Sequence, residues 1–423
     1  MSEPGSPAGR VSGDRAPVSV PASHIGWLSA AAALCVAVLA GSGIVGSDDL
    51  LAGLATLWRP SVAILSIMVS TSAAQHLGIL DMIAARIAPG TDRSPAQVFR
   101  SAFVMSAVTA AILNNDAAIL LLTPLVVILV RRCYPERPDL VVPFAFAVFA
   151  AAGVAPLVTS NPMNLIVADY LGIGFNEYAM RMAPVAVAGW LATYGVLRIL
   201  FRVPLREAAG RMGAGPYRDQ RLALPARSFL AVLVLSLACY PALSFFGWPV
   251  WPIAAGIAVL GAALCWGSRT ASPRRLAATV SWPIMIFLYC VFVIVLGLRN
   301  AGVVDVLAAL YASPTGDTAR IALIAVVSAM GSAVLNNHPM AILNALAIQG
   351  TGAWTHQQVL AALIGGDLGP RLLPMGSLAG LLWFDSLRRL DVHPGLVRFV
   401  RIGVVMTVPA LAVSLAVVLL SPP

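Results

Sequence analysis

The sequence predicts an all-α polytopic membrane protein with about nine or ten transmembrane helices, built from two inverted repeats that each contain a re-entrant hairpin and a broken helix. The 423-residue chain is 59% hydrophobic and 11% charged, and its mean hydropathy is +0.87. A soluble fold of this length could not bury so much apolar surface. The two halves also resemble each other, and each places polar residues inside apolar stretches.

The charge and cysteine patterns exclude several other classes of protein. The net charge of +9 comes from arginines, which lie mostly in short loops between apolar spans, so membrane topology accounts for it better than nucleic-acid binding. Residues 1–24 are rich in Pro, Ser and Gly and lack the apolar core of a signal peptide, which predicts a disordered cytoplasmic tail. The five cysteines have no metal-binding or CxxC spacing and are interpreted as packing residues.

Matching residues recur at an offset of 222–224 positions. Trp27 matches Trp251, Trp58 matches Trp282, Asp81 matches Asp305, and the pair at 114–115 matches the pair at 336–337. Such repeats are typical of transporters. We therefore expect a first repeat at 25–201, a cytoplasmic linker at 202–227 and a second repeat at 228–423. The helix at 228–246 should have a partner near residues 4–22, but that stretch is polar, so the first repeat lacks its opening helix.

Each repeat contains an apolar block that is too long for one crossing and too short for two. Residues 98–130 would form about 50 Å of helix, against roughly 30 Å of hydrocarbon. The sequence "LNND" in the middle predicts the tip of a re-entrant hairpin, and "LNNH" predicts the same for residues 319–348. Each hairpin precedes a span interrupted by Pro, Gly, Ser and Asn, which predicts broken helices at 141–172 and 357–387.

The positive-inside rule sets the topology. With the N-terminus in the cytoplasm and the C-terminus outside, most arginines face the cytoplasm and four (Arg59, Arg181, Arg299 and Arg320) face outward. An odd number of crossings then separates matching positions, so the repeats are inverted and the hairpins enter from opposite faces. The predicted crossings are 25–46, 55–74, 141–172, 181–201, 228–246, 250–267, 281–298, 357–387 and 401–420.

Four interruptions near the midplane predict one internal polar site, because irregular backbone at this depth needs protein or water to satisfy it. A carboxylate at the bilayer centre costs about 2.5–3.5 kcal/mol, which makes Asp116 a functional candidate. His338 occupies the matching position. Asp367 and Arg371 stand four residues apart and form either a structural ion pair or part of the site. Asp169 and Glu177 are interpreted as solvated-edge residues, and each proline taken alone as either a simple kink or a break.

Five segments resemble arsenite permeases of the ArsB type, within the ion transporter superfamily: "NNDAAILLLTP", "SNPMNLIVADYLGIGFNEYA", "LGLRNAG", "LNNHPMAILNAL" and "GGDLGPRLLPMGSLAGLLWFDSL". The resemblance extends from about residue 26 to the C-terminus. It implies proton-driven export of arsenite or antimonite across the bacterial cytoplasmic membrane, with an optional ArsA-type ATPase partner on the cytoplasmic side. The chain departs from the family in its missing first helix and in His338, where an apolar residue is common.

Arsenous acid is a small neutral trihydroxide, so its ligands should be amides, hydroxyls and backbone groups, with no cofactor or resident metal. We expect Asn115, Asn161, Asn164, Asn337 and Ser377 to bind the hydroxyls, with Ser160 and Gly376 beside them, and Asn114 and Asn336 to shape the hairpin tips. Asp116 is the expected proton carrier, followed by Asp367 and His338.

Two alternatives stay open at this point. The first is a Na⁺/H⁺ antiporter or carboxylate transporter of the same superfamily, although Ser-Asn-Pro occurs once here, whereas dicarboxylate relatives carry paired Ser-Asn-Thr motifs. The second is an intramembrane hydrolase that would pair Ser160 or Ser377 with His338. Neither an HExxH motif nor a GxSxG elbow supports it.

Overall fold

The computed structural model describes residues 22–79, 82, 94–208, 222–278, 280–352 and 354–421. These residues form α-helices and short 3₁₀ turns, and no strand occurs among them, so the predicted all-α class is confirmed. Most of the predicted tail at 1–24, Asp81, and residues 209–221 of the predicted linker lie outside the described residues.

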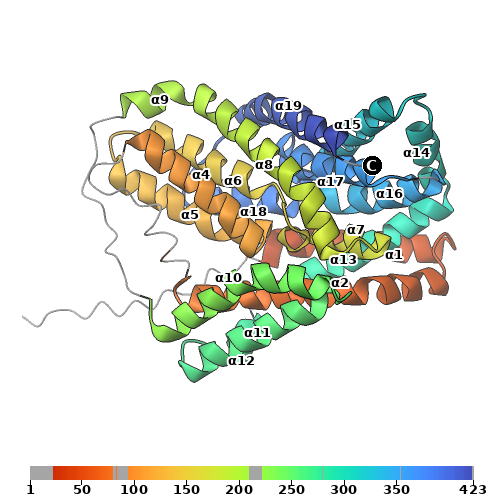
Figure 1. Ribbon diagram of the computed structural model, residues 1–423, viewed down its shortest axis with the longest axis horizontal. Helices are drawn as coiled ribbons and strands as arrows, with labels where there is room; N and C mark the ends of the chain where they lie inside the picture. Colours follow the sequence, from red (N-terminus) through yellow and green to blue (C-terminus); the bar gives the residue numbers. More distant parts are fainter. Residues whose placement is uncertain are drawn as a thin grey trace, which may run out of the picture.

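The first half contains eight described α-helices (Figure 1). They are α1 (Ala22–Gly41), α2 (Ser47–His76), α4 (Pro95–Ile112), α5 (Asn115–Cys133), α6 (Val141–Ala152), α7 (Pro162–Leu171), α8 (Phe175–Leu200) and α9 (Arg202–Glu207). Two 3₁₀ turns, η1 (Pro138–Leu140) and η2 (Val158–Ser160), precede α6 and α7.

The second half begins with α10 (Leu224–Ser244) and continues with nine further α-helices. They are α11 (Val250–Gly267), α12 (Pro273–Ala278), α13 (Trp282–Asn300), α14 (Val303–Ala312), α15 (Asp317–Leu335), α16 (Asn337–Gly350), α17 (His356–Leu368), α18 (Leu378–Arg389) and α19 (Leu396–Leu420). Between α17 and α18 lie η3 (Gly369–Arg371) and η4 (Pro374–Gly376).

Eight described helices are long and apolar enough to cross a membrane: α2, α4, α8, α10, α11, α13, α15 and α19. Of these, α4 and α15 form the first arms of the two hairpins. The stretches predicted as broken helices contain the shorter pairs α6/α7 and α17/α18, each separated by 3₁₀ turns. A polytopic membrane protein therefore follows from helix length and composition.

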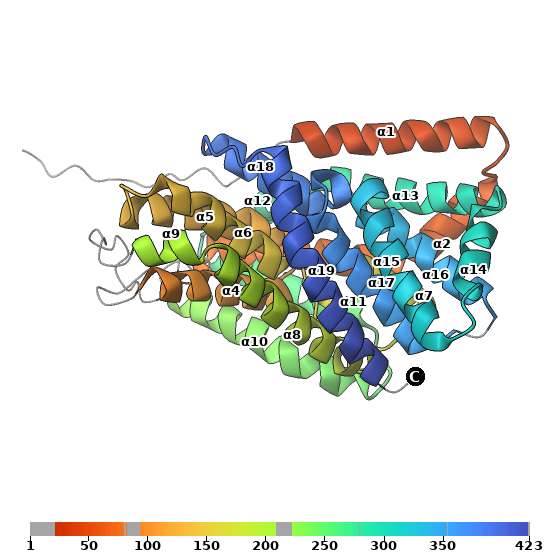
Figure 2. The same ribbon diagram turned by 90° about the horizontal axis from the view of Figure 1, so that it is seen from above.

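The packing partners in one half repeat those in the other. Helix α2 packs against α11 and α13 against α1, while α4 packs on α6 and α15 on α17. The second hairpin arms pack on the broken helix of the opposite half, α5 on α18 and α16 on α7. The hairpins α4/α5 and α15/α16 lie toward opposite ends of the long axis (Figures 1 and 2). Each half therefore covers the interrupted helix of the other half.

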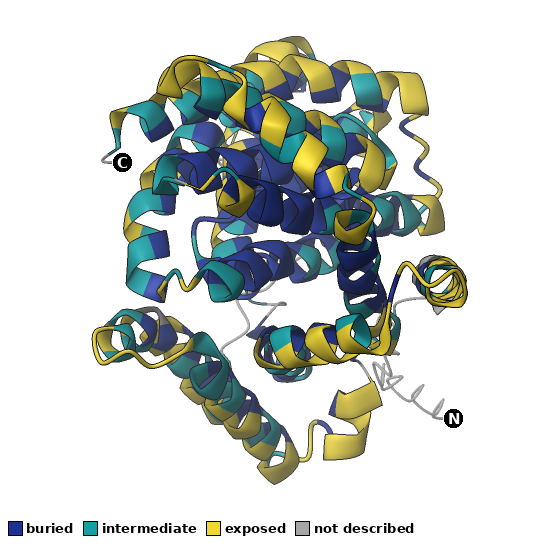
Figure 3. Ribbon diagram, turned by 90° about the vertical axis from the view of Figure 1, so that its right-hand side faces the viewer, coloured by how far each residue is buried: buried dark blue, intermediate teal, exposed yellow. Residues whose placement is uncertain are grey.

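Helix α6 is almost entirely buried, and it packs against α4, α5 and α8. Its sequence "VVPFAFAVFAAA" is apolar all round, as expected for a helix surrounded by other helices. The outer helices instead expose large apolar side chains, including Leu235, Val259 and Val408, and Figure 3 shows this exposed shell around a buried centre. The exposed apolar shell fits a lipid environment.

Glycines bring α17 and η3 unusually close to α15. A Cβ at Gly365 or Gly369 would collide with the backbone carbonyl of Ala325 or Ala329, respectively. The absence of a side chain at these positions lets the two backbones touch. This contact places the second interruption directly beside the second hairpin.

Candidate functional site

Four helices begin at the four interruptions, and each has a polar N-cap. The side-chain oxygens of Asn114, Asn161, Asn336 and Ser377 accept hydrogen bonds from the first-turn N–H groups of α5, α7, α16 and α18, at 2.7, 3.1, 3.3 and 3.0 Å. Asn, Asp, Ser and Thr favour this position because their short side chains reach the free N–H groups. Helix N-termini carry partial positive charge, so all four attract oxygen atoms of a solute.

One polar cavity is lined by residues from both hairpins and both broken helices. Its lining consists of Asn115, Asp116, Phe149, Gly153, Asn161, Asn337, His338, Asp367, Pro370, Arg371, Ser377 and Ala379. The structure thus brings together eight of the residues singled out from the sequence, although up to 262 positions separate them in the chain.

The other singled-out residues lie around the cavity without lining it. Asn114 is engaged as a cap, and Asn336 also donates from Nδ2 to the Met375 carbonyl at 3.1 Å. The Ser160 hydroxyl donates to the Ala111 carbonyl at 3.3 Å, which ties η2 to the first hairpin. Gly376 has no room for a Cβ, which would lie 2.6 Å from Pro370 Cα. These residues therefore shape the walls.

The predicted ion pair between Asp367 and Arg371 is wrong as a direct contact. The Asp367 carboxylate accepts hydrogen bonds from the Ala155 backbone N–H at 3.0 Å and from Asn161 Nδ2 at 2.9 Å. The Arg371 guanidinium donates to the Ala150 carbonyl at 2.5 Å and to Thr193 Oγ1 at 3.0 Å. The four-residue spacing brings side chains together only on a continuous α-helix, and α17 ends at Leu368.

Asp367 and Arg371, which belong to the second half, instead bind backbone and side-chain groups on either side of the break between α6 and α7 in the first half. Arg371 binds the last turn of α6, where helix carbonyls lack partners, and Asp367 binds N–H groups on the far side of the break. Both side chains are nearly fully buried, since Arg371 is 1% exposed and Asp367 is 3% exposed. Charges at this depth need such partners, because an unpaired one costs several kcal/mol.

Several buried polar atoms around the cavity have no partner among the described residues. They include Oδ1 of Asn115 and of Asn337, Nε2 of His338 and Nε of Arg371. Each such atom costs about 1–3 kcal/mol unless water or solute binds it. The Asp116 carboxylate also lines the cavity, and it makes no hydrogen bond or ion pair within the described part of the chain. The cavity thus offers unused acceptors and donors together.

Asn164 does not line the cavity, whereas His338 does. Asn164 is fully buried beside the Asp367 carboxylate and the Tyr178 hydroxyl, and neither polar atom of its amide reaches a hydrogen-bond partner among the described residues. His338 Nδ1 lies 3.2 Å from Asn336 Oδ1. Because that oxygen can only accept, we assign the proton to Nδ1, which leaves Nε2 as an acceptor.

Sequence reasoning missed two residues that support the site. Thr193 lies in the C-terminal half of α8 and accepts a hydrogen bond from Arg371, and Phe149 of α6 forms an apolar part of the cavity wall. A single threonine or phenylalanine within an apolar helix carries no distinguishing signal in the sequence. Their roles depend on contacts between distant elements.

Two discontinuous helices and two hairpins that meet around a buried polar cavity define a polytopic membrane transporter. The family model for the arsenical pump membrane protein, ArsB, matches residues 19–420, and the chain belongs to this family. Arsenical pump membrane proteins from Yersinia enterocolitica and Escherichia coli are each 30% identical to it, over 93% of this chain and 92% of theirs.

A solved structure shares the fold. The Alcanivorax borkumensis YdaH transporter matches with a TM-score of 0.60 and 14% sequence identity, covering 93% of this chain and 96% of that one. The resemblance to ArsB-type proteins is confirmed, and the chain is a membrane transporter of a bacterial arsenical pump family, consistent with the inner membrane.

Proposed function

We propose that this protein exports arsenite and antimonite from the bacterial cytoplasm as neutral trihydroxides, in exchange for protons. The family relationship supports an arsenical solute. The observation that carries the proposal is the cavity itself, which combines helix N-termini with amide oxygens and one carboxylate that have no partner among the described residues. A neutral solute with three hydroxyls needs both acceptors and donors in this way.

The binding geometry follows from which atoms are free. Hydroxyl protons of the solute would be accepted by Oδ1 of Asn115 and of Asn337, which lie on opposite hairpins. Solute oxygens would accept from Nε of Arg371 and from the Ser377 hydroxyl, whose oxygen already accepts from Gly380 N–H. The two hairpins would then bind one solute from opposite sides.

Asp116 is the proposed proton carrier. Its carboxylate has no partner in the described part of the chain, so gaining or losing a proton breaks no structural contact. Asp367 accepts two hydrogen bonds that hold the first interruption, which makes it the second choice, and His338 is the third. One proton that enters per solute exported would contribute about 2.3 kcal/mol per 100 mV of membrane potential.

The test is arsenite transport into everted vesicles or proteoliposomes with and without an imposed pH gradient. Wild-type protein should accumulate arsenite only with the gradient, and Asp116→Asn should lose this accumulation while keeping its folded yield. Asp305→Asn is the matched control, because Asp305 is exposed on α14. Full gradient-driven uptake by Asp116→Asn would reject the assignment of the carrier. Transport driven by sodium, or transport of a dicarboxylate but not arsenite, would reject the function itself.

The proposal extends to orientation and partner. We place the N-terminus in the cytoplasm and the C-terminus outside, which puts Arg131, Arg132 and the arginines of α9 and α12 on the cytoplasmic face. An ArsA-type ATPase would dock on this arginine-rich face. Co-purification of such an ATPase with the full-length protein, and its loss when Arg131 and Arg132 become glutamate, would support the partner. Unchanged co-purification by the variant would reject this docking face.

A further inference from the structure

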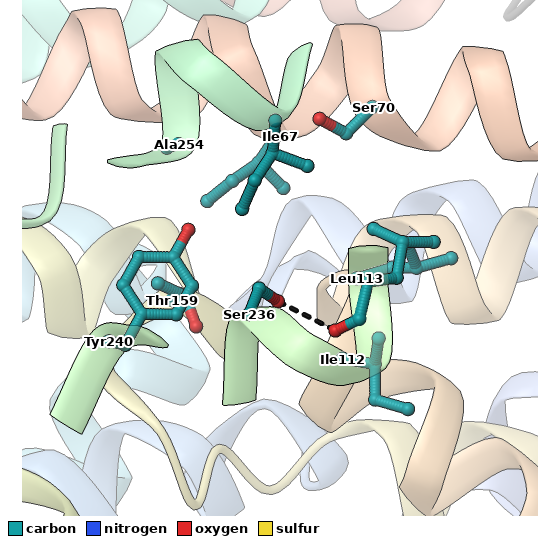
Figure 4. A pocket seen from close by; sticks show the side chains of 10 residues that line it. Ile67, Ser70, Ile112, Leu113, Thr159, Ser236, Tyr240 and Ala254 are labelled. Atoms are coloured by element: carbon teal, nitrogen blue, oxygen red, sulfur yellow. Dashed lines mark hydrogen bonds between the residues drawn. The ribbon is translucent and has the colours of Figure 1, made fainter. Parts of the chain in front are cut away.

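Two further cavities lie beside the central site. They lie between α2, α10 and α11 on one side and the break between α6 and α7, called the first interruption, on the other. The outer cavity contains about 310 Å³ of space and has Arg59, Asp169, Phe175, Trp248 and Trp251 in its lining. The inner cavity contains about 20 Å³, which is room for about one water molecule. Its lining consists of Ile67, Ser70, Ile112, Leu113, Thr159, Leu233, Ser236, Tyr240, Ala254 and Ile257 (Figure 4).

The two cavities are stacked along the same four elements. Each of these elements lines the outer cavity with one stretch and the inner cavity with a neighbouring stretch. The outer and inner stretches are 59–63 and 67–70 in α2, 244 and 233–240 in α10, 250–251 and 254–257 in α11, and 158 and 159 in η2. The stacked Phe175 and Tyr240 rings, 5.0 Å apart, lie where one cavity gives way to the other. Together they form a seam that runs from the α10–α11 loop toward the first hairpin tip.

The inner cavity presents three hydroxyls without partners. Ser70, Thr159 and Tyr240 are each 6% exposed, and none of their hydroxyls forms a hydrogen bond within the described part of the chain. Ser236 differs, because its hydroxyl donates to the Leu233 carbonyl at 2.6 Å (Figure 4). Buried hydroxyls normally find partners, so three free ones around one cavity of this size indicate that water occupies it.

A thin partition separates this inner cavity from the central site. In the first hairpin tip, Leu113 lines the inner cavity and Asn115 lines the central one. In the first interruption, Thr159 lines the inner cavity and Asn161 the central one. The partition is held by the Ser160 hydroxyl on the Ala111 carbonyl, a 3.3 Å hydrogen bond that joins η2 to α4. The segments 113–115 and 159–161 are therefore what separates the two cavities.

We propose that this seam is the route between the central site and the face bearing the α10–α11 loop, and that Ser70, Thr159 and Tyr240 form a second, transient site for a small neutral hydroxylated solute when the seam widens to admit it. The inference deepens the proposed export function and takes its solute from it. Three hydroxyls can each donate and accept, which suits a trihydroxide. No charged side chain of the described segments lines the inner cavity, so an ion would be bound poorly there.

Accessibility tests the route without depending on the solute. In a variant lacking the five native cysteines, Ser244→Cys in the outer cavity and Ser70→Cys in the inner one should both react with a membrane-impermeant methanethiosulfonate reagent added from the α10–α11 side. Ser66→Cys is the matched control, one turn earlier on α2, because Ser66 donates to the Val62 carbonyl and lines neither cavity. Labelling at 244 but not at 70, or equal labelling at 66 and 70, would overturn the route.

Transport kinetics test the site. Thr159→Val and Tyr240→Phe each remove one hydroxyl at nearly constant shape and should lower arsenite transport about two- to tenfold, whereas Ser66→Ala should leave it unchanged. Normal arsenite transport by both variants would overturn the second site. If residue 70 is labelled but the wild type carries no arsenite, the export function fails while the route stands. The two failures are therefore distinguishable.

Discussion

Replacing Asp367 by asparagine should destabilise the protein through the first interruption, more than 200 residues away in the chain. The carboxylate accepts from the Ala155 N–H and from Asn161 Nδ2 at 3.0 and 2.9 Å. Hydrogen bonds to a charged group contribute about 1.5–3 kcal/mol each, and an asparagine carbonyl can keep only one neutral bond of about 0.5–1.5 kcal/mol. The expected loss of stability is therefore about 2–5 kcal/mol. Removing the negative charge also leaves the buried Arg371 cation without a nearby counter-charge, which increases the loss.

This loss can be read as a change in the apparent Tm of the purified protein. An unfolding entropy of about 2.1 cal/mol/K per residue gives roughly 0.9 kcal/mol/K for a chain of 423 residues, so Asp367→Asn should lower Tm by about 2–6 °C. The measurement is differential scanning fluorimetry in detergent at one scan rate. Asp305→Asn, on the exposed face of α14, should move Tm by less than about 1 °C. Equal shifts for the two variants would refute the reasoning.

Three other predictions concern separate parts of the fold. Gly369→Ala should lower Tm clearly in the same assay, because its Cβ would meet backbone atoms of Ala329, whereas Gly256→Ala has open space and should not. Asn336 has φ of +86°, which is a strained value for any residue but glycine. Asn336→Gly should therefore lower Tm less than Asn336→Ala does, and the reverse order would contradict the strain. The hydrogen bond from Arg137 lowers the pKa of Asp139. That stabilisation is present above about pH 3.9 and is lost as pH falls through the lower folded pKa, so a Tm series from pH 5 to pH 2.5 should show an acid loss that Asp139→Asn lacks.

The positions of the interruptions could be predicted from the sequence, because clustered amides, prolines and glycines disfavour a continuous apolar helix. Asn114, Asn161 and Asn336 stand where helices begin, and their capping bonds are local. What those polar residues bind across the molecule could not be predicted. The Asp367 and Arg371 pairing failed because it assumed a helix that continues past Leu368.

Contacts that join distant elements escaped sequence reasoning altogether. Thr193 reaches the site only because α8 packs beside α6, and the hydroxyls of Ser70 and Tyr240 meet only because α2 and α10 lie together. No periodicity or spacing within one segment records such neighbours. The predicted roles of the cavity residues toward solute and proton also stay predictions until the transport experiments are made.

The hydrogen bonds that Asp367 and Arg371 make around the first interruption affect how the chain folds during its synthesis. Asp367 and Arg371 follow their partners Ala155, Asn161 and Ala150 by 206–221 positions. A ribosome adding 5–20 residues per second needs roughly 10–40 s to reach them. Throughout that interval, backbone groups at the break have no lasting partner in the newly inserted segment. The early part of the chain must therefore wait beside water, lipid headgroups or an insertion factor until the later part arrives.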